Sequence, residues 1–90
     1  MATPVKPRVR SDVVFRQLDE EWVAFDPVAQ RLHAMNLTAA LVWEHCTGEL
    51  TLQDIARAVH ATFADGGDLS AVERDVAEMV ERFRTEGLLE

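Results

Sequence analysis

The chain has 90 residues, enough for one domain with a single modest core and too few for a cleft between domains. Its net charge is −7 at pH 7. Residues 1 to 18 hold four basic residues against one acid, so the remaining chain is strongly acidic. Such a body repels a phosphate backbone, which argues against a nucleic acid partner. The single cysteine excludes an internal disulfide, and no signal peptide or membrane-spanning run is apparent. These features predict a cytoplasmic protein without a membrane partner.

The first eleven residues differ in composition from the rest. They combine prolines with basic side chains and show no helical or alternating apolar pattern. We interpret residues 1–11 as a flexible, basic N-terminal arm, extended or mobile, that precedes a domain of residues 12–90.

Three short runs rich in apolar and aromatic residues then suit β-strands. They are Val13 to Leu18, Trp22 to Asp26 and Arg31 to Met35. A polar turn at residues 19–21 separates the first two, and Pro27, which cannot donate to a ladder, starts the next turn. The pattern predicts a three-stranded antiparallel meander.

A helix is expected directly after the third strand. Asn36 suits an N-cap because its side-chain oxygen can accept a hydrogen bond from an unpaired N–H of the first turn. Apolar residues then recur at helical spacing from Leu37 to Cys46, and they place Trp43 in the core. Gly48 is predicted to end this helix.

The second helix begins at a capping box. Thr51 and Asp54 have the required spacing, and apolar residues repeat at helical intervals as far as Phe63. The sequence DGGD, residues 65–68, is predicted to break this helix because two glycines are costly in a helix interior.

The third helix is predicted to open with Ser70 and Glu73 as a second capping box and to end near Glu86, with Gly87 at the C′ position. Leu88 and Leu89 after the glycine are expected to fold back onto the core, and a contact with a partner stays open as the alternative. The predicted fold class is therefore α+β, with three strands followed by three helices.

Reactive side chains are few and scattered. His33, His45 and His60 fall in three different predicted elements, without the spacing of a metal site, and no phosphate-binding loop is present. Cys46 follows His45 directly and points about 100° away from it on a helix, a poor arrangement for a nucleophile and its base. We therefore expect no enzyme activity, no cofactor and no metal. Trp22 is open to either a core or a surface role.

The stretch HAMNLTAALVWEHCTGELTLQDIARAV resembles the PqqD family of small peptide chaperones, and the resemblance extends over residues 12–90. The resemblance rests on the order in which the strands, the asparagine, the Trp-Glu pair and the glycines follow one another. The matching positions are Met35, Asn36, Thr38, Ala39, Ala40, Trp43, Glu44, Gly48, Thr51, Leu52, Asp54 and Ile55, followed by Val72, Asp75, Val76, Gly87, Leu88 and Leu89.

The resemblance implies a winged helix-turn-helix-like domain, called a precursor peptide recognition element. Such a domain binds the leader of a ribosomally made precursor peptide and presents it to a modifying enzyme, a radical SAM protein in coenzyme PQQ biosynthesis. The leader would add as a strand to the third strand, in the groove against the third helix. The residues expected to form this peptide-binding site are Arg31, Leu32, His33, Ala34, Met35, Asp75, Val76, Met79 and Arg82.

Simpler interpretations of these residues stay open. Met35, Val76 and Met79 suit a core in any case, Asp75 and Arg82 are ordinary helix-surface residues, and His33 is evenly balanced between ligand contact and packing. Two other functions also fit the fold class. One is DNA binding, disfavoured by the acidic third helix. The other is an assembly module that forms a homodimer through its free sheet edge.

Overall fold

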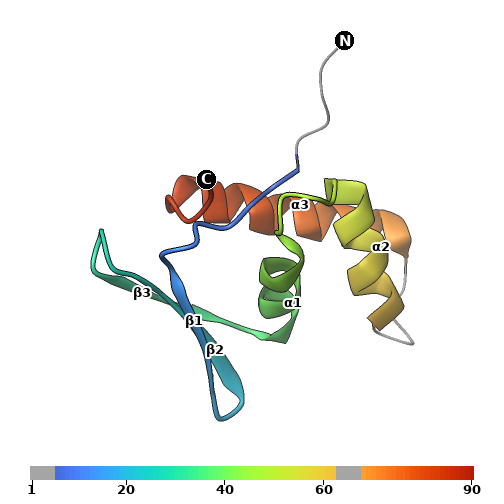
Figure 1. Cartoon of the computed structure of the whole chain (residues 1–90). Helices are drawn as coiled ribbons and strands as arrows, with labels where there is room; N and C mark the ends of the chain where they lie inside the picture. Colours follow the sequence, from blue (N-terminus) through green and yellow to red (C-terminus); the bar gives the residue numbers. More distant parts are fainter. Residues whose placement is uncertain (1–5, 63–67) are drawn as a thin grey trace.

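The structure is a computed structural model that describes residues 6–62 and 68–90. Three strands come first along the chain, β1 (Val14–Leu18), β2 (Glu21–Asp26) and β3 (Arg31–Met35). They form one antiparallel sheet in the order β1-β2-β3 (Figure 1). The predicted meander is confirmed. Its third strand has the predicted bounds, while β1 starts one residue later and β2 one residue earlier than expected.

The two turns of the sheet use different devices. Leu18 pairs with Glu21, so the first turn has two residues, and Asp19 takes a positive φ of 55° there. In the second turn the carboxylate of Asp26 accepts hydrogen bonds from the N–H groups of Val28 and Ala29, at 3.0 and 3.2 Å. Asp26 is only 2% exposed, so a buried acid organises this turn.

Three helices follow, α1 (Leu37–His45), α2 (Leu52–Thr62) and α3 (Leu69–Thr85). The number and order of the elements confirm the predicted α+β fold class. Asn36 is the N-cap of α1, and its side chain accepts a hydrogen bond from the Ala39 N–H at 2.9 Å, as predicted. The helix ends at His45 with Cys46 as its C-cap, so the predicted end was one residue too late. Gly48 lies two residues further on and adopts a φ of 85°.

The start of α2 is the predicted capping box. The Asp54 N–H donates to Thr51 Oγ1, and the Thr51 N–H donates to Asp54 Oδ2, both at 3.2 Å. The pKa of the Asp54 carboxyl is lowered, because hydrogen bonds from the Thr51 backbone and side chain favour its ionised form. The expected packing of Phe63 and the two glycines of the DGGD break lie outside the described residues.

The start of α3 corrects one prediction. Its N-cap is Asp68, whose side chain accepts a hydrogen bond from the Ser70 N–H at 3.1 Å. The proposed box of Ser70 and Glu73 was therefore wrong. An acid two residues earlier takes the capping position and leaves Ser70 inside the first helical turn.

The end of α3 confirms Gly87 at C′, where it has a φ of 76°. The Gly87 N–H donates to the Arg84 carbonyl at 3.0 Å and the Leu88 N–H donates to the Phe83 carbonyl at 2.9 Å, which is the Schellman pattern. Leu88 is consequently turned into the core and is fully buried, as predicted.

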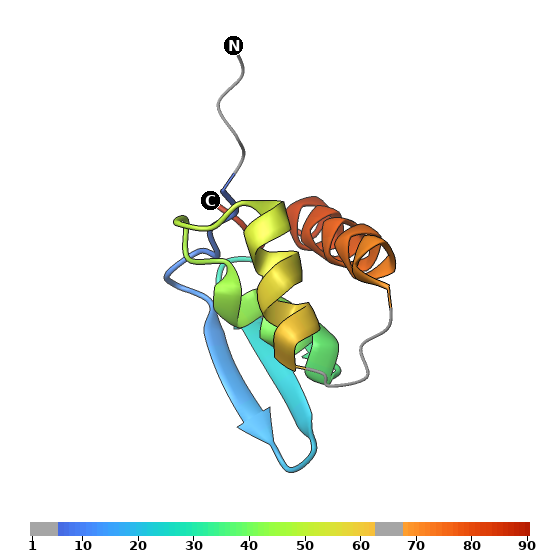
Figure 2. The same ribbon diagram turned by 90° about the vertical axis from the view of Figure 1, so that its right-hand side faces the viewer.

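The core lies between the helices and one face of the sheet (Figures 1 and 2). Trp43 of α1 occupies its centre. The indole ring stacks on Phe15 of β1, with 5.7 Å between ring centroids, and meets Phe83 of α3 edge-on at 5.4 Å. One aromatic side chain thereby joins the sheet to two helices, which confirms Trp43 as a core residue.

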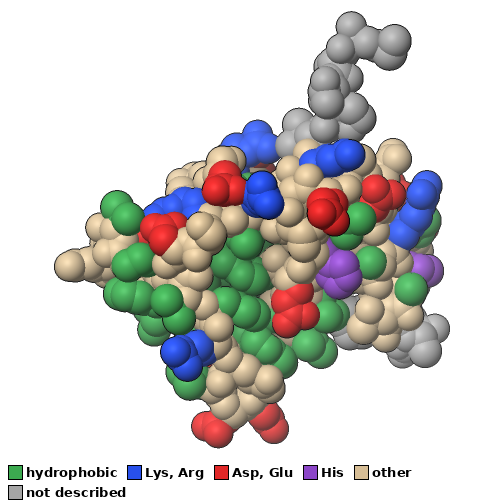
Figure 3. Space-filling view, viewed as in Figure 1, with side chains coloured by type: hydrophobic (Ala, Val, Ile, Leu, Met, Phe, Trp, Pro, Cys, Tyr) green, Lys and Arg blue, Asp and Glu red, His purple; other side chains and the backbone are tan. Residues whose placement is uncertain are grey.

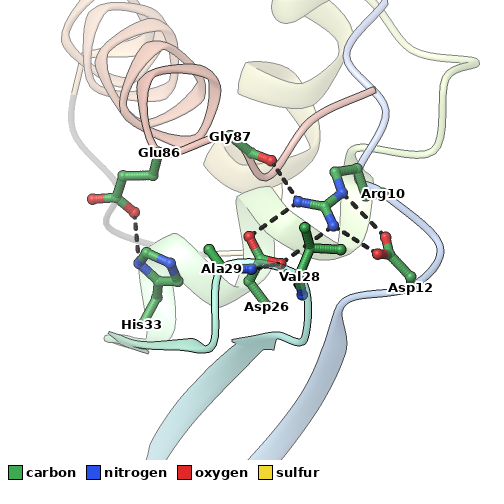
Figure 4. Close-up of polar contacts among 8 residues, drawn as sticks. All are labelled: Arg10, Asp12, Asp26, Val28, Ala29, His33, Glu86 and Gly87. Atoms are coloured by element: carbon green, nitrogen blue, oxygen red, sulfur yellow. Dashed lines mark hydrogen bonds and ion pairs between the residues drawn. The ribbon is translucent and has the colours of Figure 1, made fainter.

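Residues 7–10 run extended beside the C-terminus. The Val9 N–H donates to the Cys46 carbonyl at 3.0 Å, and the Arg10 N–H donates to the Leu88 carbonyl at 2.9 Å. Pro7 is buried and Val9 half-buried. Arg10 then directs its guanidinium to Asp26, so this segment connects the C-terminal residues with the β2–β3 turn (Figure 4).

Candidate functional site

The free edge of β3 faces a groove beside α3. Among the described residues, β3 pairs with β2 on one side and with no strand on the other. Within the same part of the chain, no Cα of β3 lies within 8 Å of a Cα of α3. Side chains line the space between them as a hollow of about 190 Å³. Its lining residues are His33, Ala34, Met35, Asn36, Ala39, Met79, Arg82, Phe83 and Glu86.

The base of this groove is apolar. Met35 is 7% exposed and Phe83 is 4% exposed, and both belong to the core. Met79 is half-buried and packs against that core from α3. An apolar side chain that entered the groove would therefore meet a preformed hydrophobic surface.

A polar contact crosses the groove at one end. His33 Nδ1 of β3 lies 2.9 Å from Glu86 Oε2, just after α3 (Figure 4). Arg82 Nε donates to the other carboxylate oxygen of Glu86 at 3.1 Å. The His33 side chain is 14% exposed, whereas that of Arg82 is 71% exposed. Glu86 thus holds the imidazole in place and leaves most of the guanidinium in solvent.

The second ring nitrogen of His33, Nε2, is buried and has no hydrogen-bond partner among the described residues. In the neutral ring, a proton on Nδ1 that is donated to Glu86 leaves only a lone pair on Nε2. An N–H that is buried without an acceptor raises the free energy of the folded state more than a buried lone pair does. The contact with Glu86 therefore favours the Nδ1–H tautomer.

The ladder determines which backbone groups of β3 face the groove. In a two-residue hairpin the pair that flanks the turn is hydrogen-bonded, and such pairs alternate along an antiparallel ladder. Counting from the Leu18–Glu21 pair, the β2 partners of Leu32 and Ala34 direct their backbone groups toward β1. We infer that Leu32 and Ala34 direct their own N–H and C=O groups to the free edge.

Five of the predicted site residues line the groove, namely His33, Ala34, Met35, Met79 and Arg82. The other four do not. Arg31 lies at the turn end of β3, and the side chain of Leu32 stands on the opposite sheet face, 64% exposed. Val76 is a core residue at 1% exposure, and Asp75 is exposed beside it.

Four lining residues were not predicted from the sequence. Phe83 and Glu86 lie four and seven positions after Met79, so extending the helical face by one turn would have found both. Asn36 and Ala39 come from the start of α1. No sequence signal marked them as groove residues, because their place depends on how α1 packs against the strand.

The side chains considered for catalysis are not arranged for it. Burial raises the pKa of the Cys46 thiol to about 12, and the side chain is 1% exposed. His45 Nδ1 is 2.7 Å from the Leu41 carbonyl, one turn back in its own helix. Within residues 6–62 and 68–90, no group of three or more His, Cys, Asp or Glu side chains could hold a metal ion. In those same ranges no helix is long and apolar enough to cross a membrane.

Trp22 takes a mixed position. It is half-buried, packs against the core and also lines a second hollow, of about 560 Å³, under the β1–β2 turn. This hollow shares Ala34, Met35 and Asn36 with the groove. The two hollows therefore follow the same end of β3.

An α+β domain whose edge strand borders a half-apolar groove defines a class of small domains able to accept a further strand. The chain belongs to the PqqD family, since the family model described as coenzyme PQQ synthesis protein D matches residues 21–89. No curated protein matches it significantly.

Two solved structures have the same fold. One is TbiB1 in complex with the TbiA(beta) leader peptide, at 20% identity and a TM-score of 0.78, covering 92% of this chain and 94% of that one. The other is lasso peptide synthetase B1 complexed with the leader peptide, at 22% identity and a TM-score of 0.79, covering 94% of this chain and 98% of that one. At these identities the likeness establishes the fold.

Proposed function

We propose that this domain is a non-catalytic module that binds the leader of a ribosomally made precursor peptide and presents it to a modifying enzyme. The observation that carries the proposal is the free edge of β3 beside the groove. Membership of the PqqD family supports it. Both similar solved structures are complexes with a leader peptide, which supports it further.

The mode of binding is strand addition. An edge strand offers unpaired N–H and C=O groups, and an extended peptide satisfies them while placing alternate side chains on the two faces of the sheet. Leu32 and Ala34 supply the backbone groups. Side chains of the peptide that face α3 enter the groove over Met35 and Met79.

The polar rim of the groove supplies selectivity. Glu86 is held by His33 and Arg82, so a bound peptide meets one carboxylate and two cationic or hydrogen-bonding groups at the same end. Arg31, Leu32, Asp75 and Val76 do not line the groove. We therefore propose that Arg31 and Asp75 act at its rim, whereas Leu32 acts through its backbone and Val76 through support of the core.

A proline scan of the two free sheet edges tests this function. Ala34→Pro removes an N–H directed to the β3 edge and spares the pairing with β2. The controls are Ala34→Val, which keeps the N–H, and Gln17→Pro, which removes an N–H at the outer edge of β1. Binding is measured by fluorescence anisotropy with a labelled synthetic leader of the precursor encoded nearest to this gene.

We expect Ala34→Pro to weaken leader binding at least tenfold, with both controls within about twofold of the wild type. Far-UV circular dichroism checks that each variant is folded. Equal affinity for a folded Ala34→Pro variant would show that strand addition at β3 is not the mode. Loss of binding in Gln17→Pro instead would place the peptide on β1.

The partner enzyme follows from the pathway that supplies the leader. A radical SAM protein is the proposed partner if that pathway makes coenzyme PQQ. We place this activity in the cytoplasm, where ribosomal peptides are made. The β3 edge could also pair with a second copy of the chain. In that event light scattering would show a dimer that dissociates when the leader peptide is added.

A further inference from the structure

The face of the sheet that is turned away from the helices is apolar. Val14, Phe25 and Leu32 stand directly across from one another on the three strands, as the register of the sheet requires. Their exposed fractions are 42%, 39% and 64%. Leu18 continues the apolar surface along β1, at 56% exposure.

This composition departs from what a solvated sheet face shows. An antiparallel sheet with one face in water alternates apolar residues inward with polar residues outward. Here Arg16, Val23 and Ala34 form the next row, and Leu18 pairs with Glu21 in the row after it. One cation and one acid therefore share this face with the apolar side chains. We call the outward-facing side chains Val14, Leu18, Val23, Phe25 and Leu32 the outer face.

The outer face is uncovered within the described residues. The helices pack on the opposite side of the sheet (Figures 1 and 2). Ala24 and Met35 belong to the core on that side. The space-filling view shows hydrophobic side chains at the surface over the strand half of the molecule (Figure 3). Apolar side chains gathered on an uncovered sheet face are available for contact with a partner.

We propose that the outer face docks the enzyme that modifies the precursor, and that the bound leader enlarges this docking surface. The inference rests on the proposed function. A leader strand added at β3 would lie beside Leu32, and its alternate side chains would stand on the outer face as a fourth row. The enzyme then meets a surface built from both the domain and the peptide.

The size of the outer face favours this enzyme over a second copy of the chain. In the plane of the sheet, three strands of about five residues have a flat area of roughly 240 Å². This value follows from a rise of about 3.3 Å per residue and a strand spacing of about 4.8 Å. A stable dimer buries about 800 Å² per partner. The outer face alone is therefore too small to hold two copies together.

An enzyme can supply the missing affinity in another way. The part of the precursor beyond the leader is the substrate of the enzyme, so a single peptide contacts both the domain and the enzyme. This link raises the effective concentration of the enzyme at the domain. A weak apolar contact is then sufficient. Arg16 and Glu21 lie on the same sheet face, so a suitable enzyme surface is apolar and carries both an acid and a base.

The test measures leader binding and enzyme binding separately. The probes are the synthetic leader peptide and the purified modifying enzyme encoded in the same gene cluster. Phe25→Thr replaces the aromatic side chain at the centre of the outer face by threonine, which suits a strand. Val14→Thr removes an apolar side chain of the outer face on β1, which β2 and β3 separate from the added leader strand. The matched control is Val28→Thr, because Val28 is 76% exposed but lies in the β2–β3 turn.

We expect the leader to tighten enzyme binding to the wild-type domain at least fivefold. Phe25→Thr and Val14→Thr should weaken enzyme binding at least tenfold in the presence of leader and leave the leader Kd within twofold. Val28→Thr should change neither. Unchanged enzyme binding in both outer-face variants would overturn the inference while leader binding stood.

Two further outcomes separate the proposals. Failure of the wild-type domain to bind leader overturns the proposed function and, with it, the composite surface. A wild-type domain that sediments as a dimer, and as a monomer after Phe25→Thr, would assign the outer face to a second copy of the chain and overturn the enzyme assignment.

Discussion

His33 Nδ1 and Glu86 Oε2 lie 2.9 Å apart and join β3 to the end of α3 across the groove (Figure 4). No Cα atoms of the two elements come within 8 Å of one another among the described residues, so side chains alone make this connection. The width of the groove at this end is therefore set by one imidazole and one carboxylate.

The coupling between these two residues is measurable. A double-mutant cycle with His33→Ala and Glu86→Ala compares the free energies of unfolding in urea. We expect a coupling free energy of about 0.5 to 1 kcal/mol, since the pair is partly buried. The Arg84–Glu81 pair, 3.6 Å apart and mostly exposed, is the control, and its coupling should be close to zero. Equal couplings in the two cycles would contradict a special role for the His33–Glu86 contact.

Asp26 should make the stability of the domain depend on pH. The hydrogen bond from the Arg10 guanidinium lowers the pKa of this carboxyl, and the Ala29 and Val28 N–H groups lower it further, against the opposing effect of burial. A lowered folded-state pKa gives stability that is present above the unfolded value, about 3.9, and is lost as the pH falls through the folded value.

Substitution of this acid is expected to remove that dependence. Asp26→Asn should lower the Tm at pH 7 by on the order of 5 to 10 °C and flatten the fall in Tm between pH 5 and pH 2. Glu20→Gln in the first turn is the control and should change neither. A variant with the wild-type acid transition would show that Asp26 does not cause it.

Cys46 is expected to be unreactive in the native protein. With a pKa of about 12, the thiolate fraction at pH 8 is roughly one part in ten thousand, and the side chain is buried as well. Labelling by a thiol reagent at pH 8 should therefore proceed only as fast as the domain unfolds, whereas the protein in guanidinium reacts at once. A rapid native phase would contradict this burial.

The same thiol contributes to the pH dependence of stability. Because the folded-state pKa of Cys46 is raised, its contribution to the free energy of unfolding is fully present below about pH 8.5 and is lost as the pH rises toward 12.

Gly87 offers a test of the turn after α3. A Cβ at this position would meet no atom within 4 Å, so the cost of Gly87→Ala comes from the positive φ of 76° alone. We expect a loss of about 1 to 2 kcal/mol in the free energy of unfolding. Gly87→Asn should cost less, because asparagine tolerates this conformation better. Equal losses for the two variants would point to a cause other than backbone conformation.

Local chemistry explains why most of the fold could be predicted from the sequence. Runs rich in apolar and aromatic residues mark the strands, the Asn36 cap and the Thr51–Asp54 box begin two helices, and Gly87 ends the third. Each of these signals acts over a few residues. The start of α3 was misplaced because Asp68 and Ser70 both suit a cap, and sequence spacing does not choose between them.

The groove was predicted only in part. Five lining residues were identified from the sequence, namely His33, Ala34, Met35, Met79 and Arg82, whereas Phe83 and Glu86 were missed. Asn36 and Ala39 were missed as well, because their place in the groove depends on how α1 packs against β3. The outer face was not predicted from the sequence either. Apolar residues occur on both faces of these strands, so the sequence does not show which face of the sheet the helices cover.

The sequence by itself therefore determined the elements, their order, the free edge of a three-stranded meander and the family. Those features follow from periodicity, caps and turns, which are local. The tertiary structure decided which side chains meet, including His33 with Glu86, Arg10 with Asp26 and the row from Val14 to Leu32. Contacts between residues far apart in the chain depend on how whole elements pack, and no short stretch of sequence specifies that packing.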